Sequence, residues 1–271
     1  MSIFRDDILK GKTTLITGGG TGICKGIAMR FAGHGSNIAI TSRKQENLDE
    51  AAEEIREATG AEVLAMAADV REPEQVEAVV AKTAEKFGGI DTLINGAAGN
   101  FPVPAAALTY KGFRTVLEID LQGSFNVSKA CFEELAKAGE KHGNANIICI
   151  SATLQYTGVP FQVHVCAAKA GIDAMMRTLA NEWGPLGIRV NCVSPGPIGD
   201  TEGMRRLAPT PEILAKAEKS VPLRRFGTIQ EIADSCLFLV SEASQYTTGA
   251  ILIVDGGAWV SSQGLGGFEL D

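Results

Sequence analysis

Short apolar runs alternate along the chain with longer stretches in which apolar residues recur at helical spacing. The short runs are rich in β-branched residues and are bounded by turn-forming residues, as strands are. Strands are predicted at 13–17, 37–41, 62–68, 91–95, 146–151, 188–194 and 250–255, and helices at 44–58, 73–87, 112–138, 167–182 and 228–241. Because right-handed crossovers join parallel strands, this alternation predicts an α/β fold. We expect a single Rossmann-type doubly wound domain, residues 1–271, whose seven-stranded parallel sheet carries helices on both faces.

One segment interrupts the alternation between the sixth and seventh predicted strands. Residues 196–226 contain four prolines, yet they include a helical run near 211–219. A connection of this length is typical of a functional loop, so we predict that it forms a substrate lid. Six basic residues against four acidic ones lie within 199–226. That balance fits a mixed surface helix as well as a basic patch.

The composition excludes several classes of protein. Hydrophobic residues make up 45% of the chain and charged residues 21%, which is an ordinary globular composition. A net charge of −7 gives no overall basic surface for nucleic acid, and no apolar run approaches the length of a membrane span. The six cysteines and three histidines lack metal-ligand spacing, so no metal site is expected. The chain end FELD lacks a peroxisomal address, which favours a cytoplasmic location.

A glycine-rich turn, TGGGTGIC at 17–24, follows the first predicted strand and opens a helix. Glycines let the backbone approach a pyrophosphate, and the helix N-terminus supplies free N–H groups. A plain turn would fit the glycines alone, but their place in the βαβ series favours dinucleotide binding. The second strand ends in Thr41-Ser42-Arg43-Lys44, without an acid for the ribose 2′-hydroxyl. Arg43 and Ser42 suit a 2′-phosphate, so NADP is favoured over a merely solvated basic turn.

From Lys12 to Ala258 these motifs resemble the short-chain dehydrogenase/reductase family. The match includes TGGGTGI at 17–23, Asp69-Val70, NGAAG at 95–99, Lys169 and PGPI at 195–198, while Cys24 stands where the family usually has a third glycine. The resemblance implies a nicotinamide cofactor bound by a set of residues that follow the strands. These are Gly18, Gly20, Thr21, Gly22, Ile23, Ser42, Arg43, Asp69, Val70, Asn95, Gly96, Ala97, Lys169, Pro195, Gly196, Ile198 and Thr201.

The catalytic positions of the family are changed in this chain. The usual tyrosine stands four residues before the lysine, and here that position is Val165. The usual serine is replaced by Ala152, and the variant with a tyrosine seven residues before the lysine would need one at Gln162. Reduction of an ordinary carbonyl would therefore lack both its acid and its oxyanion donor.

A carboxylate has been gained where these groups were lost. Asp120 occupies the position of a family asparagine, on an apolar helix face near Lys169. The two residues could form a structural ion pair, or they could together hold a water that protonates the product. The coordinated loss of tyrosine and serine with the gain of an aspartate favours the second interpretation.

This combination resembles the peroxisomal type of 2,4-dienoyl-CoA reductase. The matching segments include AAGNFPVPA at 97–105, EIDLQGSFNVS at 118–128 and QVHVCAAKAGIDAM at 162–175. The resemblance implies hydride transfer from NADPH to a dienoyl-CoA, with Asp120 and Lys169 orienting the proton-donating water. It also implies that Arg71 and Arg206 bind the CoA, that Phe101 contacts the acyl part, and that the protein forms a homodimer or homotetramer.

Two other functions stay open from the sequence. The chain could reduce another carbonyl or enoyl substrate, with Tyr156 or a water as the acid, or it could be a non-catalytic NADP-binding scaffold. His164 directly precedes Val165 and so points about 100° away from it on a helix. We therefore interpret His164 as a packing residue rather than a replacement acid.

Overall fold

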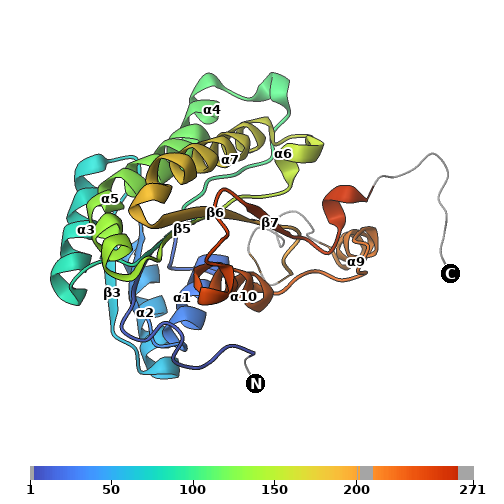
Figure 1. Ribbon diagram of the computed structural model, residues 1–271. Coiled ribbons are helices and arrows are strands. Elements are labelled where there is room, and N and C mark those ends of the chain that lie inside the picture. Colours follow the sequence, from blue (N-terminus) through green and yellow to red (C-terminus); the bar gives the residue numbers. More distant parts are fainter. Residues whose placement is uncertain (1–2, 200, 202–209, 262–271) are drawn as a thin grey trace.

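The structure is a computed structural model that describes residues 3–199, 201 and 210–261 (Figure 1). Its centre is a seven-stranded parallel sheet in the order β3-β2-β1-β4-β5-β6-β7. The strands are β1 (Thr13–Thr17), β2 (Asn37–Ser42), β3 (Val63–Ala67), β4 (Thr92–Asn95), β5 (Ala145–Ile150), β6 (Ile188–Pro195) and β7 (Ile251–Val254). The predicted doubly wound sheet is confirmed, and each strand lies within two residues of its predicted bounds.

Helices cover both faces of the sheet (Figure 1). One layer holds α1 (Gly22–Ala32), α2 (Gln45–Thr59) and α10 (Ile229–Val240), and the other holds α3 (Pro73–Phe87), α5 (Gly123–His142) and α7 (Val163–Trp183). Neighbouring strand residues serve opposite layers, since side chains alternate across a strand. Ile16 packs with the α1 layer and Leu15 with the α5 layer, and both are buried.

The predicted helix at 112–138 is wrong in one respect, because it is interrupted. It consists of α4 (Tyr110–Leu117), the π-helical turn η2 (Glu118–Gln122) and α5. A π turn inserts one residue into the helical repeat without any proline, so the apolar period does not reveal it. Asp120 lies at the centre of this turn and is fully buried.

The segment at 196–226 contains α9 (Pro211–Ser220), which confirms the helix predicted near 211–219. Thr210 caps α9 by accepting a hydrogen bond from the Ile213 N–H at 3.4 Å. Arg206 lies outside the described residues. The remaining short elements are α6 (Leu154–Thr157), η1 (Ala105–Ala107), η3 (Gly184–Leu186), η4 (Glu242–Ser244) and η5 (Ala258–Val260). Across the described ranges, none of the helices combines the length and apolar character that crossing a membrane requires.

Candidate active site

A cavity of about 650 Å³ opens at the carboxyl ends of β1, β4, β5 and β6. This edge is where the strand order reverses, between β1 and β4, and open α/β sheets bind ligands at such a point. More than half of the expected cofactor residues line the cavity. They are Gly18, Thr21, Gly22, Ile23, Gly96, Lys169, Pro195, Gly196, Ile198 and Thr201.

The glycines of the cavity fit a closely approaching dinucleotide. Gly18 has a φ of 72°, and a Cβ atom there would lie 2.9 Å from the carbonyl oxygen of Gly96. Thr21 is the N-cap of α1, yet its side chain makes no capping hydrogen bond. The first N–H groups of α1 therefore have no side-chain cap to compete with an anion, and a helix N-terminus of this kind suits a phosphate.

Several expected cofactor residues support the cavity without lining it. The amide of Asn95 donates to Ser128 Oγ at 2.9 Å, and the N–H of Ala97 donates to Thr17 Oγ1 at 3.1 Å. Val70 is buried against Gly123, and Gly20 packs against α2. These contacts hold the strand ends in place.

The ends of β2 and β3 form a charged rim beside the cavity. Arg71 Nε donates to Asp69 Oδ1 at 3.0 Å, and this hydrogen bonding lowers the pKa of the Asp69 carboxyl. Arg43 lies close enough for its charge to lower that pKa further, and Ser42 ends β2 beside it. Arg43 itself is exposed and makes no ion pair with the residues that the structure describes. The structure thus leaves Arg43 available to an anion, whereas Arg71 is already paired with Asp69.

Lys169 lines the cavity, and it meets Asp120, which is fully buried and does not itself line the cavity. Lys169 Nζ lies 3.3 Å from Asp120 Oδ2 and donates to the carbonyl oxygen of Ile150 at 3.0 Å. Asp120 Oδ1 accepts from the Gly99 N–H at 2.7 Å. Asp120 Oδ2 is enclosed and has no hydrogen bond from the described residues. One carboxylate oxygen is therefore fixed by the backbone, and the other faces the ammonium group with an unfilled acceptor position.

The first two turns of α7 contribute a mixed wall to the cavity. Gln162, Val165 and Lys169 all line it, as residues spaced by three and four share a helix face. Asn100 Nδ2 donates to Gln162 Oε1 at 2.7 Å across the cavity mouth. Neither Asn100 nor Gln162 was among the predicted site residues. The helical spacing from Lys169 could have indicated Gln162, but nothing local indicated Asn100.

Phe101 and His164 pack together beside the cavity. Their ring centroids lie 4.5 Å apart at an interplanar angle of 78°, and the Phe101 ring is 40% exposed. His164 is fully buried, and neither of its ring nitrogens is hydrogen-bonded to a described residue. His164 does not line the cavity, in agreement with its interpretation as a packing residue.

Tyr156 is tied into a buried network instead of reaching the cavity. Its hydroxyl donates to Asp173 Oδ2 at 2.9 Å, and Asp173 also accepts from Ser151 at 2.7 Å and from Gln155 at 2.8 Å. Burial, followed by the Asp173 hydrogen bond, raises the pKa of Tyr156 to about 12. A phenol with this pKa and this partner is a poor proton donor at neutral pH.

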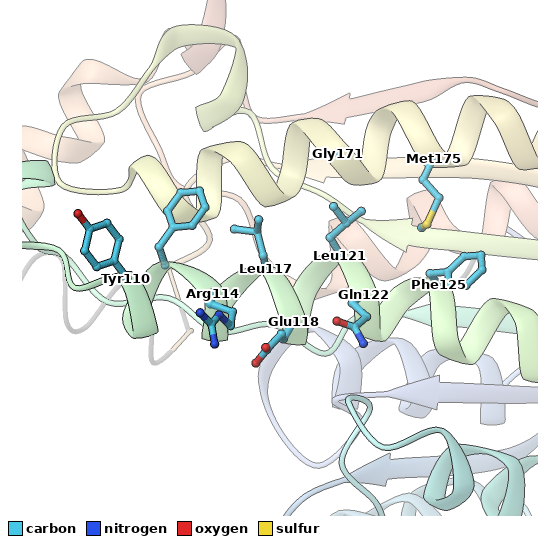
Figure 2. Close-up of a pocket in the computed structure, with 10 residues that line it drawn as sticks. Tyr110, Arg114, Leu117, Glu118, Leu121, Gln122, Phe125, Gly171 and Met175 are labelled. Carbon is cyan, nitrogen blue, oxygen red and sulfur yellow. The ribbon is translucent and has the colours of Figure 1, made fainter.

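A second hollow, of about 880 Å³, lies on the outer surface between α7 and the helix formed by α4, η2 and α5. Figure 2 shows Leu117 and Leu121 directed toward α7, with Met175 of α7 pointing back toward Phe125. Glu118 and Gln122 point to the other side of the same helix. The hollow is predominantly apolar and is separate from the Asp120–Lys169 pair.

Comparisons with known proteins place this arrangement in a family. Residues 18–258 match the family described as enoyl-(acyl carrier protein) reductase. The chain is 48% identical to a peroxisomal 2,4-dienoyl-CoA reductase of Danio rerio, covering 96% of this chain and 85% of the relative. A relative of the same description from Saccharomyces cerevisiae is also 48% identical, over 94% of this chain and 87% of its own length. Both relatives are described as producing (3E)-enoyl-CoA.

The expected cytoplasmic location is contradicted by these comparisons. Both relatives are described as peroxisomal, not as cytoplasmic. The expectation depended on the last residues of the chain, and a short targeting address is independent of the fold that relatives share.

A solved structure supports the family assignment independently. The crystal structure of a short-chain dehydrogenase from Bacillus anthracis is 40% identical and superposes with a TM-score of 0.81, covering 94% of this chain and 99% of that one. The shared sheet and the glycine-rich turn are the features that bind nicotinamide cofactors in such proteins. The chain therefore belongs to the short-chain dehydrogenase/reductase family of oxidoreductases.

Proposed function

We propose that the protein is an NADPH-dependent 2,4-dienoyl-CoA reductase. The observation that carries the proposal is the contact between the buried Asp120 and Lys169, which lines the cavity, in a site whose Tyr and Ser positions are Val165 and Ala152. A dienoyl thioester needs a proton at carbon, which a held water can deliver, and it needs no phenol at a carbonyl oxygen. The relatives' described activity agrees with this chemistry.

The pair is suited to hold a water molecule. Asp120 Oδ2 is an enclosed acceptor without a hydrogen bond among the described residues, and buried acceptors of this kind usually bind water. Among the described residues Lys169 makes one hydrogen bond, to Ile150, so its ammonium group keeps N–H donors for the same water. The carboxylate would then accept from the water while the ammonium donates to it, which orients one proton toward the substrate.

When NADPH is bound, it supplies the hydride for the distal carbon of the conjugated system. Charge then develops on the thioester oxygen, and the water held by Asp120 and Lys169 protonates the α-carbon to give a 3-enoyl-CoA. Val165 and Ala152 line the same cavity and offer apolar surface to the acyl chain.

The charged rim favours NADPH over NADH. Ser42 and Arg43 stand at the end of β2, and no acid takes the place that would bind a ribose 2′-hydroxyl. The exposed guanidinium of Arg43 is available to pair with a 2′-phosphate.

The substrate side is assigned from the resemblance, since neither Arg71 nor Phe101 lines the cavity. We assign Phe101 to the acyl part and Arg71 and Arg206 to the CoA, with 196–226 acting as a lid. Arg71 would have to share its guanidinium between Asp69 and the ligand. A reductase that uses Tyr156 as its acid is disfavoured, because the Tyr156 hydroxyl is bonded to Asp173.

The apolar hollow between α7 and the α4–α5 helix is proposed as the contact surface for a second copy of this chain. Phe113, Phe125 and Tyr110 are exposed along it, at 36%, 45% and 94% respectively. Monomeric proteins rarely expose a contiguous apolar surface of this kind. A two-fold arrangement would place the same apolar residues against each other, so one surface suffices for dimerisation.

The test is the oxidation of NADPH by the purified protein with 2,4-hexadienoyl-CoA, with NADH and a simple ketone in parallel. The proposal expects rapid turnover of the dienoyl thioester with NADPH alone. Turnover of the ketone instead would point to another substrate class. Binding of NADPH without any turnover would support a non-catalytic scaffold.

A further inference from the structure

The amide of Gln162 is held in one orientation at the cavity wall. Gln162 is more than nine-tenths buried, and its Oε1 atom accepts from Asn100 Nδ2 at 2.7 Å. Because the amide oxygen is occupied by Asn100, the Nε2 group is turned away from Asn100. No described residue accepts a hydrogen bond from Nε2. The side chain thus presents two N–H donors without an acceptor among the residues that the structure describes.

Gln162 stands on the same face of α7 as Lys169. Gln162, Val165 and Lys169 follow each other at helical spacing along one wall of the cavity. Gln162 is also the N-cap residue of α7, with its backbone carbonyl accepting from the Cys166 N–H at 3.0 Å. This places its amide at the positive end of the helix dipole, where negative charge is stabilised.

Two of the neighbouring donors already have partners. Ser151 donates its hydroxyl proton to Asp173, and the Gly99 N–H donates to Asp120. The hydroxyl of Thr153, which also lines the cavity, is the competing donor on this wall.

We propose that Gln162 Nε2 is the donor that stabilises the thioester oxygen, and that Asn100 is a positioning residue that aims it. This inference rests on the proposed function. A new C–H bond forms at C5 with the hydride that NADPH supplies, and the C4–C5 and C2–C3 electron pairs shift to give C3=C4 and C1=C2 double bonds. The carbonyl pair moves onto the thioester oxygen, which accepts from Gln162. Protonation at C2 then restores the carbonyl and leaves the C3=C4 bond.

Substitution Gln162→Met tests the donor while keeping the side-chain length. An interaction made only in the transition state lowers kcat without raising KM, and loss of one oxyanion donor lowers kcat by about 100-fold or more. We expect that loss with the affinity for NADPH unchanged. The matched control is Gln230→Met on the exposed surface of α10, which should retain wild-type kcat. A kcat for Gln162→Met within about twofold of wild type would overturn the inference.

Substitution Asn100→Asp tests the positioning role without touching Gln162. A carboxylate at position 100 can only accept, so it would draw Gln162 Nε2 toward itself and away from the substrate. We expect a loss of kcat comparable to that of Gln162→Met. Thr153→Val removes the competing donor, and a large loss there with normal turnover of Gln162→Met would assign the role to Thr153 instead.

A spectroscopic measurement separates this inference from the proposed function. The carbonyl stretch of a ¹³C-labelled dienoyl-CoA, bound with NADP⁺, should shift to lower frequency in the wild-type protein and shift less in Gln162→Met. A wild-type protein that does not reduce dienoyl-CoA overturns both proposals. A wild-type protein that reduces it, with an identical carbonyl frequency in Gln162→Met, overturns only the role of Gln162.

Discussion

The Sγ atom of Cys24 occupies the space that a side chain at position 96 would need. A Cβ atom built on Gly96 would lie 2.1 Å from this sulfur and 3.1 Å from the carbonyl oxygen of Thr17. Burial raises the pKa of the Cys24 thiol to about 12, so the group is neutral and acts as a packing atom. Cys24 therefore takes the place of the family's third glycine while β1 and β4 stay close together. This is possible because Gly96 has no side chain and leaves room for the sulfur.

The first prediction follows from that contact. Gly96→Ala should destabilise the protein by about 1–3 kcal/mol, the usual cost of overpacking, and should weaken NADPH binding. The double variant Gly96→Ala with Cys24→Gly should recover most of the loss. Thermal unfolding and NADPH titration measure both effects. Gly184→Ala is the control, because a Cβ atom there meets nothing within 4 Å. Equal effects of Gly96→Ala in the presence and absence of Cys24 would contradict the packing argument.

Removing the charge of Asp120 should affect turnover much more than cofactor binding. Asp120→Asn leaves Lys169 Nζ without its carboxylate partner, which lies 3.3 Å away, and deprives the proposed water of an acceptor. General acid–base contributions suggest a fall in kcat of about 100-fold or more. Tyr156→Phe is the control, since Tyr156 bonds to Asp173 outside the cavity. Steady-state kinetics with dienoyl-CoA would refute the role of Asp120 if this variant kept wild-type kcat.

The choice of cofactor should depend on Arg43. A charge-assisted hydrogen bond contributes about 1.5–3 kcal/mol, so Arg43→Ala should weaken NADPH binding by roughly 10- to 100-fold. Binding of NADH, which lacks the 2′-phosphate, should change little. Fluorescence titration with both cofactors measures the difference. Equal losses of affinity for the two cofactors would show that Arg43 supports cofactor binding in general and does not bind a 2′-phosphate.

The apolar hollow should determine the oligomeric state. Phe125 is 45% exposed on α5, so Phe125→Glu would place a charge in the proposed contact and should yield monomers. Sedimentation velocity measures the mass of the particle. Tyr246→Glu, at an exposed position outside the hollow, should leave the mass unchanged. A wild-type monomer, or a Phe125→Glu protein with the wild-type mass, would refute this contact surface.

Acid should weaken the fold partly through Glu231. A hydrogen bond from Arg225, followed by the Thr228 N–H, lowers the pKa of Glu231 to about 2. A carboxyl whose pKa is lower in the folded state stabilises the fold above its unfolded pKa, near 4.3. That contribution is lost as the pH falls through the folded value of about 2.

The free energy of unfolding, measured with denaturant, should therefore fall less steeply from about pH 5 to pH 2 in Glu231→Gln than in the wild type. Glu57→Gln removes the same charge from an exposed position on α2 and should follow the wild-type decline. Glu231 and Thr228 form the capping box of α10. If the free energy of unfolding fell equally with pH in Glu231→Gln and the wild type, this capping box would not contribute to acid unfolding.

The parallel sheet, and the edge of it at which the site lies, were predictable because they follow from local sequence patterns. Each strand is a short apolar run in the sequence, and the strands of a sheet joined by right-handed crossovers are parallel, so the carboxyl ends of β1, β4 and β5 share one edge. The glycine-rich turn follows the first strand and was placed at that edge by the same rule, whereas Lys169 was assigned to the site by the family resemblance; residues of both line the cavity. The helix at 112–138 was predicted as continuous, since a π turn leaves no mark on the apolar period.

The sequence by itself determined the fold, the family and the unusual pairing of an aspartate with Lys169. Only the tertiary structure decided which partners the polar groups take. Asn100 and Gln162 are 62 residues apart, and Tyr156 turns to Asp173 instead of the cavity. Periodicity reports which face of an element is buried, because that property depends on neighbouring residues in the chain. The direction of a hydrogen bond depends on which elements meet, and that is settled only when the crossovers bring distant segments together.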